Sequence, residues 1–212
     1  MGNYHYIIAG LPDIVLDFEN SGYDLDALFE HISEMSSLQD RRCMEWLFFG
    51  LNEENLNNHF YRAAKKSKTK FIREYFTFDL ELRNFQTAYI ARKNSLDPTD
   101  YLIGKSEVTE QLKTSKAPDF GLSLYSDSAS VIFKILGNNN ILEREQLLDK
   151  LRWNKANEIC TFSYFDINAI LSFLLKASII KRWYKLDKKK GSVLFKQFVD
   201  EIKGTFKPDN NY

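Results

Sequence analysis

The amino-acid sequence predicts an all-α protein made of two packed helical bundles. Glycine and proline, which disfavour helix interiors, number only 9 and 4 among 212 residues, whereas leucine, lysine and glutamate are abundant. Apolar side chains recur at three- and four-residue spacing along most of the chain, and no sheet pattern stands out. We expect one all-helical domain over 1–212, with sub-bundles at about 1–103 and 104–212. A chain of this length can form its core without disulfides or metal ions.

The first elements follow from alternation and from capping residues. Residues 4–16 are predicted to be a short extended segment, because tyrosine and isoleucine alternate with other residues until Pro12. Asp24 is a suitable N-cap for a helix over about 25–35. Two serines then separate this helix from a second one over about 38–49.

The remaining helices are predicted from apolar stripes and helix-ending residues. Their expected ranges are about 58–75, 79–94, 128–136, 143–157, 166–186 and 193–202. Pro98 and the run 117–121 indicate loops, and Gly137 is placed to end a helix. Residues 104–120 carry no clear pattern. Ser163 or Asp166 is expected to begin the long helix that runs to about residue 186.

The charge is balanced overall but unevenly distributed. The 29 basic and 29 acidic side chains cancel, whereas residues 1–60 carry a net charge of −9 and residues 161–212 a net charge of +5. A protein that binds nucleic acid by neutralising phosphates would show a basic excess. Two explanations remain open: oriented docking of a dipolar molecule into an assembly, or attraction between two parts of one fold.

The sequence carries no targeting or membrane-spanning signal. Its N-terminus lacks the basic and apolar regions of a signal peptide, and the most apolar window, 167–180, is too short and too polar to span a bilayer. Cys43 and Cys160 lie among apolar neighbours, which is typical of reduced, buried thiols. We therefore expect a soluble cytoplasmic protein that meets a membrane only through partners.

No catalytic, metal or cofactor site is predicted. His5, His31 and His59 lack the spacing of metal ligands. The stretch 104–106, Gly-Lys-Ser, resembles the end of a phosphate-binding loop, but Thr99 stands where the first glycine of that loop would be. Neighbouring carboxylates lie on polar helix ends rather than in acid/base pairs. We expect a non-catalytic protein without a cofactor.

A stretch that mixes basic and aromatic residues is a candidate interface. It contains Lys181, Arg182, Trp183, Tyr184 and Lys185, followed by three lysines at 188–190. One interpretation is nucleic-acid or anionic-lipid binding. Another is an exposed helix end whose basic residues interact favourably with the helix dipole. The third is a protein-docking surface anchored by the two aromatic residues.

Three blocks of sequence together resemble a known family. The first block is 4–13, which reads YHYIIAGLPD. The second covers 78–85 and continues to Ala91-Arg92, and the third covers 166–176 and continues to 180–183. They are similar to a bacterial family of unknown function that resembles the C-type (also named d-type) adaptor of V-type and archaeal-type rotary ATPases. This chain is shorter than that adaptor and has room for about two of its three bundles.

The resemblance implies a non-catalytic, funnel-shaped adaptor that transmits torque between the central stalk and the membrane rotor ring during ion transport. The stalk and the ring are then its partners, and its location is cytoplasmic and peripheral to the membrane. Four polar residues on the matching helices would line the cavity that receives the stalk: Asn84, Arg92, Asn168 and Lys176. The alternative is that these four cap helices or pair within their own bundle.

Three rival functions remain open beside the rotary ATPase adaptor. The first is a free-standing helical adaptor or regulator that binds a soluble protein. The second is a nucleic-acid or acidic-surface binder that uses residues 181–190, and steep weakening by salt would identify it. The third is an enzyme, which would show a deep pocket lined by titratable groups with shifted pKa values.

Overall fold

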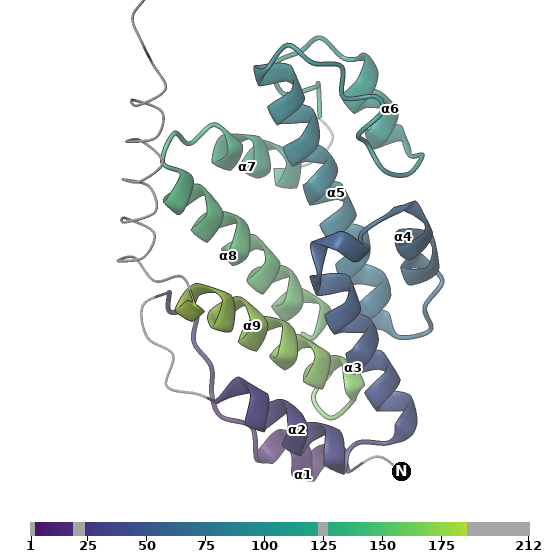
Figure 1. The fold of residues 1–212 in the computed structure, drawn as a ribbon, viewed down its shortest axis with the longest axis vertical. Coiled ribbons are helices and arrows are strands. Elements are labelled where there is room, and N and C mark those ends of the chain that lie inside the picture. The colour runs from purple at the N-terminus through teal and green to yellow at the C-terminus, as the bar shows by residue number, and fades with distance from the viewer. Residues whose placement is uncertain (1–2, 19–23, 123–126, 186–212) are drawn as a thin grey trace, which may run out of the picture.

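The computed structural model describes residues 3–18, 24–122 and 127–185. Every regular element in these ranges is a helix, which confirms the all-α prediction (Figure 1). The elements are α1 (Tyr4–Ala9), α2 (Leu25–Met35), α3 (Leu38–Leu51), the 3-10 turn η1 (Glu53–Asn55), α4 (Asn58–Lys65), α5 (Lys70–Lys93), α6 (Glu107–Thr114), α7 (Asp127–Leu136), α8 (Ile141–Ile159) and α9 (Ile167–Lys185). The expected helix over 193–202 lies outside the described residues.

The longest helix, α5, connects the two ends of the molecule. It has 24 residues and packs against α3, α4, α6, α7, α8 and α9. In Figure 1, α6 and α7 lie at one end of α5, and α1 and α2 lie at the other end of the molecule, beside α9. Helix α8 runs beside α9 and reaches from α7 toward the middle of the molecule. The fold is therefore organised around α5 and α8.

The buried apolar side chains form two clusters that share α5 and α8. The larger cluster contains side chains from the first five helices (α1, α2, α3, α4 and α5), from the second half of α8 and from α9. It includes Phe71, Phe76 and Leu171, each 1% exposed or less. The smaller cluster joins the second half of α5 to α6, α7 and the first half of α8, and it includes Leu82 and Leu148. Because both clusters include side chains of α5 and α8, these two helices hold the two ends of the described fold together. The sub-bundle boundary near residue 103 stays a prediction.

Local capping explains where several helices begin. The Asp24 carboxylate accepts hydrogen bonds from the backbone N–H groups of Asp26 and Ala27, at 3.2 and 3.1 Å, which confirms the predicted cap of α2. The Ser37 hydroxyl caps α3 through the N–H of Asp40. Asp166 accepts from the N–H of Ala169 and begins α9 in the same way. Of the two residues expected to begin this helix, Ser163 and Asp166, it is Asp166 that does so.

Two sequence predictions about helix boundaries are wrong. The N-terminal segment is helical over Tyr4–Ala9 rather than extended. Its buried side chain is Ile7, at 2% exposed, which lies between the alternating residues Tyr6 and Ile8. The expected break between 75 and 79 is also absent, since α5 continues through Thr77, whose hydroxyl donates to the carbonyl of Arg73 at 2.7 Å. The chain turns earlier, between α4 and α5.

Candidate functional site

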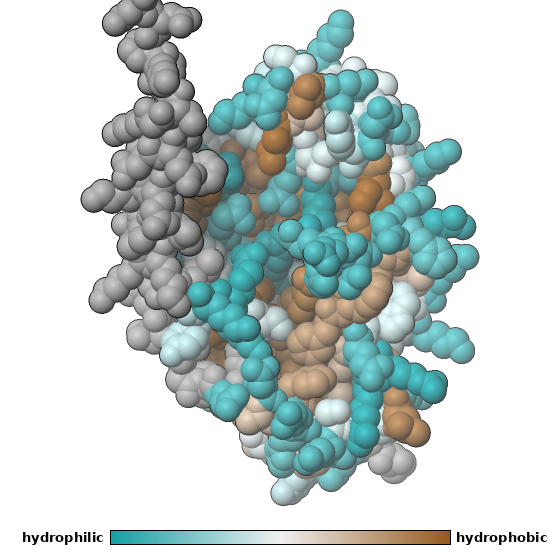
Figure 2. All heavy atoms as spheres, in the orientation of Figure 1, coloured by the Kyte–Doolittle hydropathy of each residue, from teal (hydrophilic) through white to brown (hydrophobic). Residues whose placement is uncertain are grey.

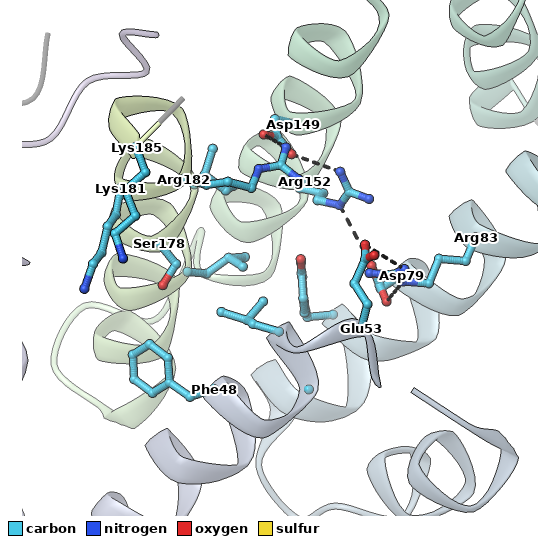
Figure 3. Close-up of a pocket in the computed structure, with 15 residues that line it drawn as sticks. Phe48, Glu53, Asp79, Arg83, Asp149, Arg152, Ser178, Lys181, Arg182 and Lys185 are labelled. Atoms are coloured by element: carbon cyan, nitrogen blue, oxygen red, sulfur yellow. Dashed lines mark hydrogen bonds and ion pairs between the residues drawn. The ribbon is translucent and has the colours of Figure 1, made fainter. Parts of the chain in front are cut away.

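A surface groove along α9 combines charged and apolar side chains. Its main part is a cleft of about 420 Å³ between α3, α5, α8 and α9 (Figure 3). A smaller hollow of about 220 Å³ lies between α2, α3 and α9. Both are lined by Phe48, Ser178 and Lys181, so they are adjacent. We call the cleft and the hollow together the α9 groove.

The floor of the α9 groove is apolar. Helix α9 contributes Leu174, Leu175 and Ile179, which are 6% exposed or less, because this helix buries most of its circumference. The half-buried rings of Phe29 from α2 and Phe48 from α3 complete the floor and meet edge to face, with centroids 4.8 Å apart. Figure 2 shows hydrophobic side chains gathered over this part of the face, with hydrophilic ones around them.

One wall of the cleft is built around the buried carboxylate of Asp149, which is 1% exposed. One of its oxygens accepts from Arg152 at 2.9 Å. The other accepts from the indole N–H of Trp183 at 2.6 Å and from the guanidinium of Arg182. The carboxylate thus ties α8 to the end of α9, and both of its oxygens are satisfied.

The opposite wall is built around a second buried carboxylate, Asp79 of α5, which is 3% exposed. It accepts from the Tyr61 hydroxyl at 2.8 Å and from Nε of Arg83 at 2.9 Å. Nε of Arg152 lies 3.9 Å from its other oxygen, so Arg152 stands between the two carboxylates. We call Asp79, Asp149, Arg83, Arg152 and Arg182, with their hydroxyl and indole donors, the buried charge cluster.

The charges of this cluster stabilise one another. Burial alone would lower the pKa of Arg83, but attraction to Asp79 outweighs this effect and raises it. The pKa of Arg152 is also raised. Burial acts to lower it, but the neighbouring Tyr75, Asp79 and Asp149 outweigh this effect. Both guanidiniums therefore stay charged. Because each carboxylate is held by at least two donors, the cluster joins its helices into a rigid frame.

The rim of the groove is cationic. Among the described residues, the cleft is lined by five basic side chains and three acidic ones. Lys181 and Lys185 stand one turn apart on α9, and Figure 3 shows both at the edge of the cleft beside Ser178. Two of the carboxylates that meet rim cations are themselves at the surface. Asp26 pairs with Lys181, and Glu53 lies 3.3 Å from Arg83, with side chains 79% and 77% exposed.

The structure brings together part of the basic and aromatic stretch that the sequence singled out. Lys181, Arg182 and Lys185 line the groove. Trp183 is 6% exposed and packs edge to face on Phe18, so it supports the groove from within. Tyr184, at 67% exposed, faces outward and is not among the lining residues.

Asn84 and Arg92 of α5 lie away from the groove. The Asn84 amide, 5% exposed, donates to the carbonyl of Ile103 at 2.9 Å and accepts from its N–H at 3.0 Å. The Arg92 guanidinium donates to the carbonyl of Ser115 at 2.7 Å and lies 3.4 Å from the ring centre of Phe120. Both side chains hold loops of this chain against α5. Their role at an interface stays a prediction.

Asn168 and Lys176 of α9 also make internal contacts. The side-chain oxygen Oδ1 of Asn168 accepts from the backbone N–H of Phe71 at 2.9 Å, which joins the start of α9 to the start of α5. The ammonium of Lys176 lies 5.3 Å from the ring centre of Trp153, and burial lowers its pKa. As for the α5 pair, contact with a partner at these two positions stays a prediction.

Sequence reasoning missed both carboxylates of the buried charge cluster. A local signal exists for each. Asp79 follows Ile72 and Tyr75 on the buried stripe of α5, and Asp149 precedes Trp153 on the buried stripe of α8. Acidic residues at core spacing need a buried partner. The arginines at i+4 and i+3 are further signals, but no local pattern indicates that the two helices share Arg152.

Three tyrosines make the stability sensitive to alkaline pH. Burial, and then the neighbouring Asp40, raise the pKa of Tyr4 to about 12, and burial with Asp79 raises the pKa of Tyr61 and Tyr75. An unfolded tyrosine titrates near pH 10. Each folded phenol holds its proton more tightly, so its contribution is complete below about pH 10 and is lost as pH rises through the raised values. In urea unfolding at pH 8, 10 and 11, the free energy of unfolding is expected to fall as the pH rises.

The matched variant for this prediction is Tyr61→Phe, which cannot ionise at that position. Its free energy of unfolding is expected to fall less steeply between pH 10 and 11 than that of the parent chain. An absorbance titration at 295 nm follows the phenolates directly. Equal slopes for the two chains would contradict a raised pKa at Tyr61.

The described helices include none with both the length and the apolar composition to cross a bilayer. Among the described side chains, no group of three or more His, Cys, Asp or Glu is placed to hold a metal ion. A model of the family described as "Protein of unknown function (DUF2764)" matches residues 50–205, a span that contains the whole buried charge cluster. No curated protein and no solved structure matches the chain.

Proposed function

The chain belongs to the DUF2764 family, whose function is unknown, and from that premise we propose that it is a non-catalytic structural component of a V-type ATPase or ATP synthase. In this role it couples the central stalk to the membrane rotor ring. The structural observation that supports a docking role is the α9 groove, an apolar floor with a cationic rim on a rigid frame. A surface of this kind suits a protein partner.

The interior supports a mechanical role. A coupling component has to transmit force between two partners without bending. Helices α5 and α8 each pass through both hydrophobic clusters, and the charge cluster links them through Asp79, Arg152 and Asp149. Breaking such buried pairs is costly, so relative movement of α5, α8 and α9 is disfavoured. The assignment to a rotary ATPase rests on the three blocks of sequence resemblance.

The groove residues favour a binding role over a catalytic one. Both oxygens of Asp149 are occupied by donors of this chain, and Asp79 accepts from a hydroxyl and a guanidinium. A general base needs a free oxygen within reach of the proton that it removes. Asp149 acts as a counter-ion for the arginines instead, and Asp79 is held through one oxygen by Tyr61 and Arg83 while its other oxygen faces Arg152.

The test is recovery of partners from native membranes. The tagged chain is isolated after gentle solubilisation and the co-purified proteins are identified by mass spectrometry. We expect catalytic-head, stalk and rotor-ring proteins in fixed ratio. The double variant K181E/K185E reverses two rim charges and is expected to recover these proteins at least about tenfold less well. The control K93E/K105E makes the same change at two exposed positions outside the groove.

Recovery from the soluble fraction alone, without ATPase components, would overturn the rotary ATPase assignment. It would favour the second candidate, a free-standing adaptor or regulator of a soluble protein, because the α9 groove is equally suited to such a partner. Equal loss in the groove variant and in the control would show that net charge, rather than the groove, governs association.

A further inference from the structure

The α9 groove consists of two adjacent hollows, one on each side of Phe48, Ser178 and Lys181. Its two parts share Phe48, Ser178 and Lys181, so it extends from Phe29 on α2 to the wall that carries Arg83 on α5. Apolar side chains from α2, α3 and α9 line both parts, and Figure 2 shows hydrophobic side chains at the surface on this face. Apolar grooves of this kind receive amphipathic helices, whose side chains at i, i+3, i+4 and i+7 fill them.

The positive charges at the rim favour a negatively charged partner. Lys181 and Lys185 are separated by one helical turn, and Arg182, whose side chain is 48% exposed, also lines the cleft and extends to Asp149. The buried carboxylates neutralise only part of this positive charge. Carboxylates that border the apolar face of a partner helix would therefore meet cations on the groove wall.

Two surface carboxylates of this chain already occupy the positions that such a partner would use. Asp26 pairs with Lys181 at the α2 end, and this contact lowers the pKa of Asp26. Glu53 contacts Arg83 at the η1 end. Both carboxylates are exposed to water, where ion pairs are weak and exchange readily. The pairs at Asp79 and Asp149 are buried and are not exchangeable in this way.

We infer that the α9 groove receives an amphipathic helix of a partner protein, with acidic side chains beside its apolar face. On binding, these acidic side chains replace Asp26 and Glu53 at Lys181 and Arg83. The inference rests on the proposed function in that the groove is taken as a protein-docking surface. It adds the chemistry and the secondary structure of the docking segment.

The test uses the full chain and three synthetic peptides of equal length. The first forms an amphipathic helix with leucine and phenylalanine on one face and glutamate beside it. The second has lysine in place of glutamate, and the third is a scrambled version of the first. We expect the first peptide to bind at least about tenfold more tightly than the other two by fluorescence anisotropy. The variant K181E/K185E should reverse the preference between the acidic and the basic peptide.

The double variant D26N/E53Q tests the replacement step. Removing both competing carboxylates is expected to tighten binding of the acidic peptide severalfold. The control E30Q removes an exposed carboxylate of α2 that does not line the groove, and it should leave binding unchanged. Unchanged or weaker binding by D26N/E53Q would overturn the replacement. Equal binding of the acidic and scrambled peptides, or no binding of the acidic peptide, would overturn the helix-in-groove inference.

These outcomes separate the inference from the proposed function. Peptide binding with no ATPase components recovered from membranes would overturn the rotary ATPase assignment and retain the groove. Recovery of ATPase components that is unaffected by K181E/K185E, together with no peptide binding, would retain the assignment and overturn the groove as the docking site.

Discussion

Replacing Asp149 by asparagine is expected to destabilise the fold by about 3–5 kcal/mol, the cost of leaving a buried charge without its partner. The carboxylate is 1% exposed and meets Arg152, Arg182 and the indole N–H of Trp183. An amide of the same size keeps one acceptor oxygen, but it places its own N–H₂ group against these donors. Arg152, only 12% exposed, then loses its charged partner on α8 and has few routes to water.

Urea unfolding followed by circular dichroism measures this effect. The matched control is Asp26→Asn, which also removes one carboxylate from a pair with a groove cation. Asp26 lies at the surface, so its replacement should leave the urea midpoint almost unchanged. A loss of less than about 1 kcal/mol for Asp149→Asn would show that the buried charge cluster contributes little to the stability of the fold.

Replacing Gly50 by alanine is expected to be the next most damaging change. Gly50 lies in α3 where this helix crosses the rings of Phe60 and Phe76, and an added Cβ would lie 2.4 and 2.3 Å from their Cζ atoms. Both rings are buried and packed edge to face, with centroids 4.9 Å apart, so neither can move without disturbing the core. Overpacking of this kind costs about 1–3 kcal/mol or more. That cost exceeds the gain of about 1 kcal/mol that alanine brings to a helix.

The control for this prediction is Gly10→Ala, at the end of α1. There an added Cβ meets only backbone oxygens at 3.5 Å, and the backbone lies in the ordinary right-handed region. Thermal and urea unfolding should show a lower stability for Gly50→Ala and almost no change for Gly10→Ala. A stability for Gly50→Ala equal to or above that of the parent chain would mean that α3 moves away from the two rings at little cost.

Local features explain why much of the helical fold could be predicted. The caps at Asp24 and Asp166 act on backbone groups two or three residues away, and the stripes of α2, α3, α8 and α9 follow one helical period. The two wrong boundaries have a common cause. Three alternating residues before Pro12 are too few to distinguish a strand from a helix, and a helix break between 75 and 79 was expected where Asp79 lies on the buried stripe. Partners on other helices instead satisfy Asp79 inside a continuous α5.

For the candidate site, the sequence by itself determined the identity and order of the basic residues on α9. Lys181, Arg182 and Lys185 are close in the chain, so their common face follows from the helical period. Only the tertiary structure decided that they line the same cleft as Asp79 and Asp149, because the carboxylates come from α5 and α8 and no local pattern reports which helices meet. The groove depends on those long-range contacts, since its floor, walls and rim are contributed by α2, α3, α5, α8 and α9.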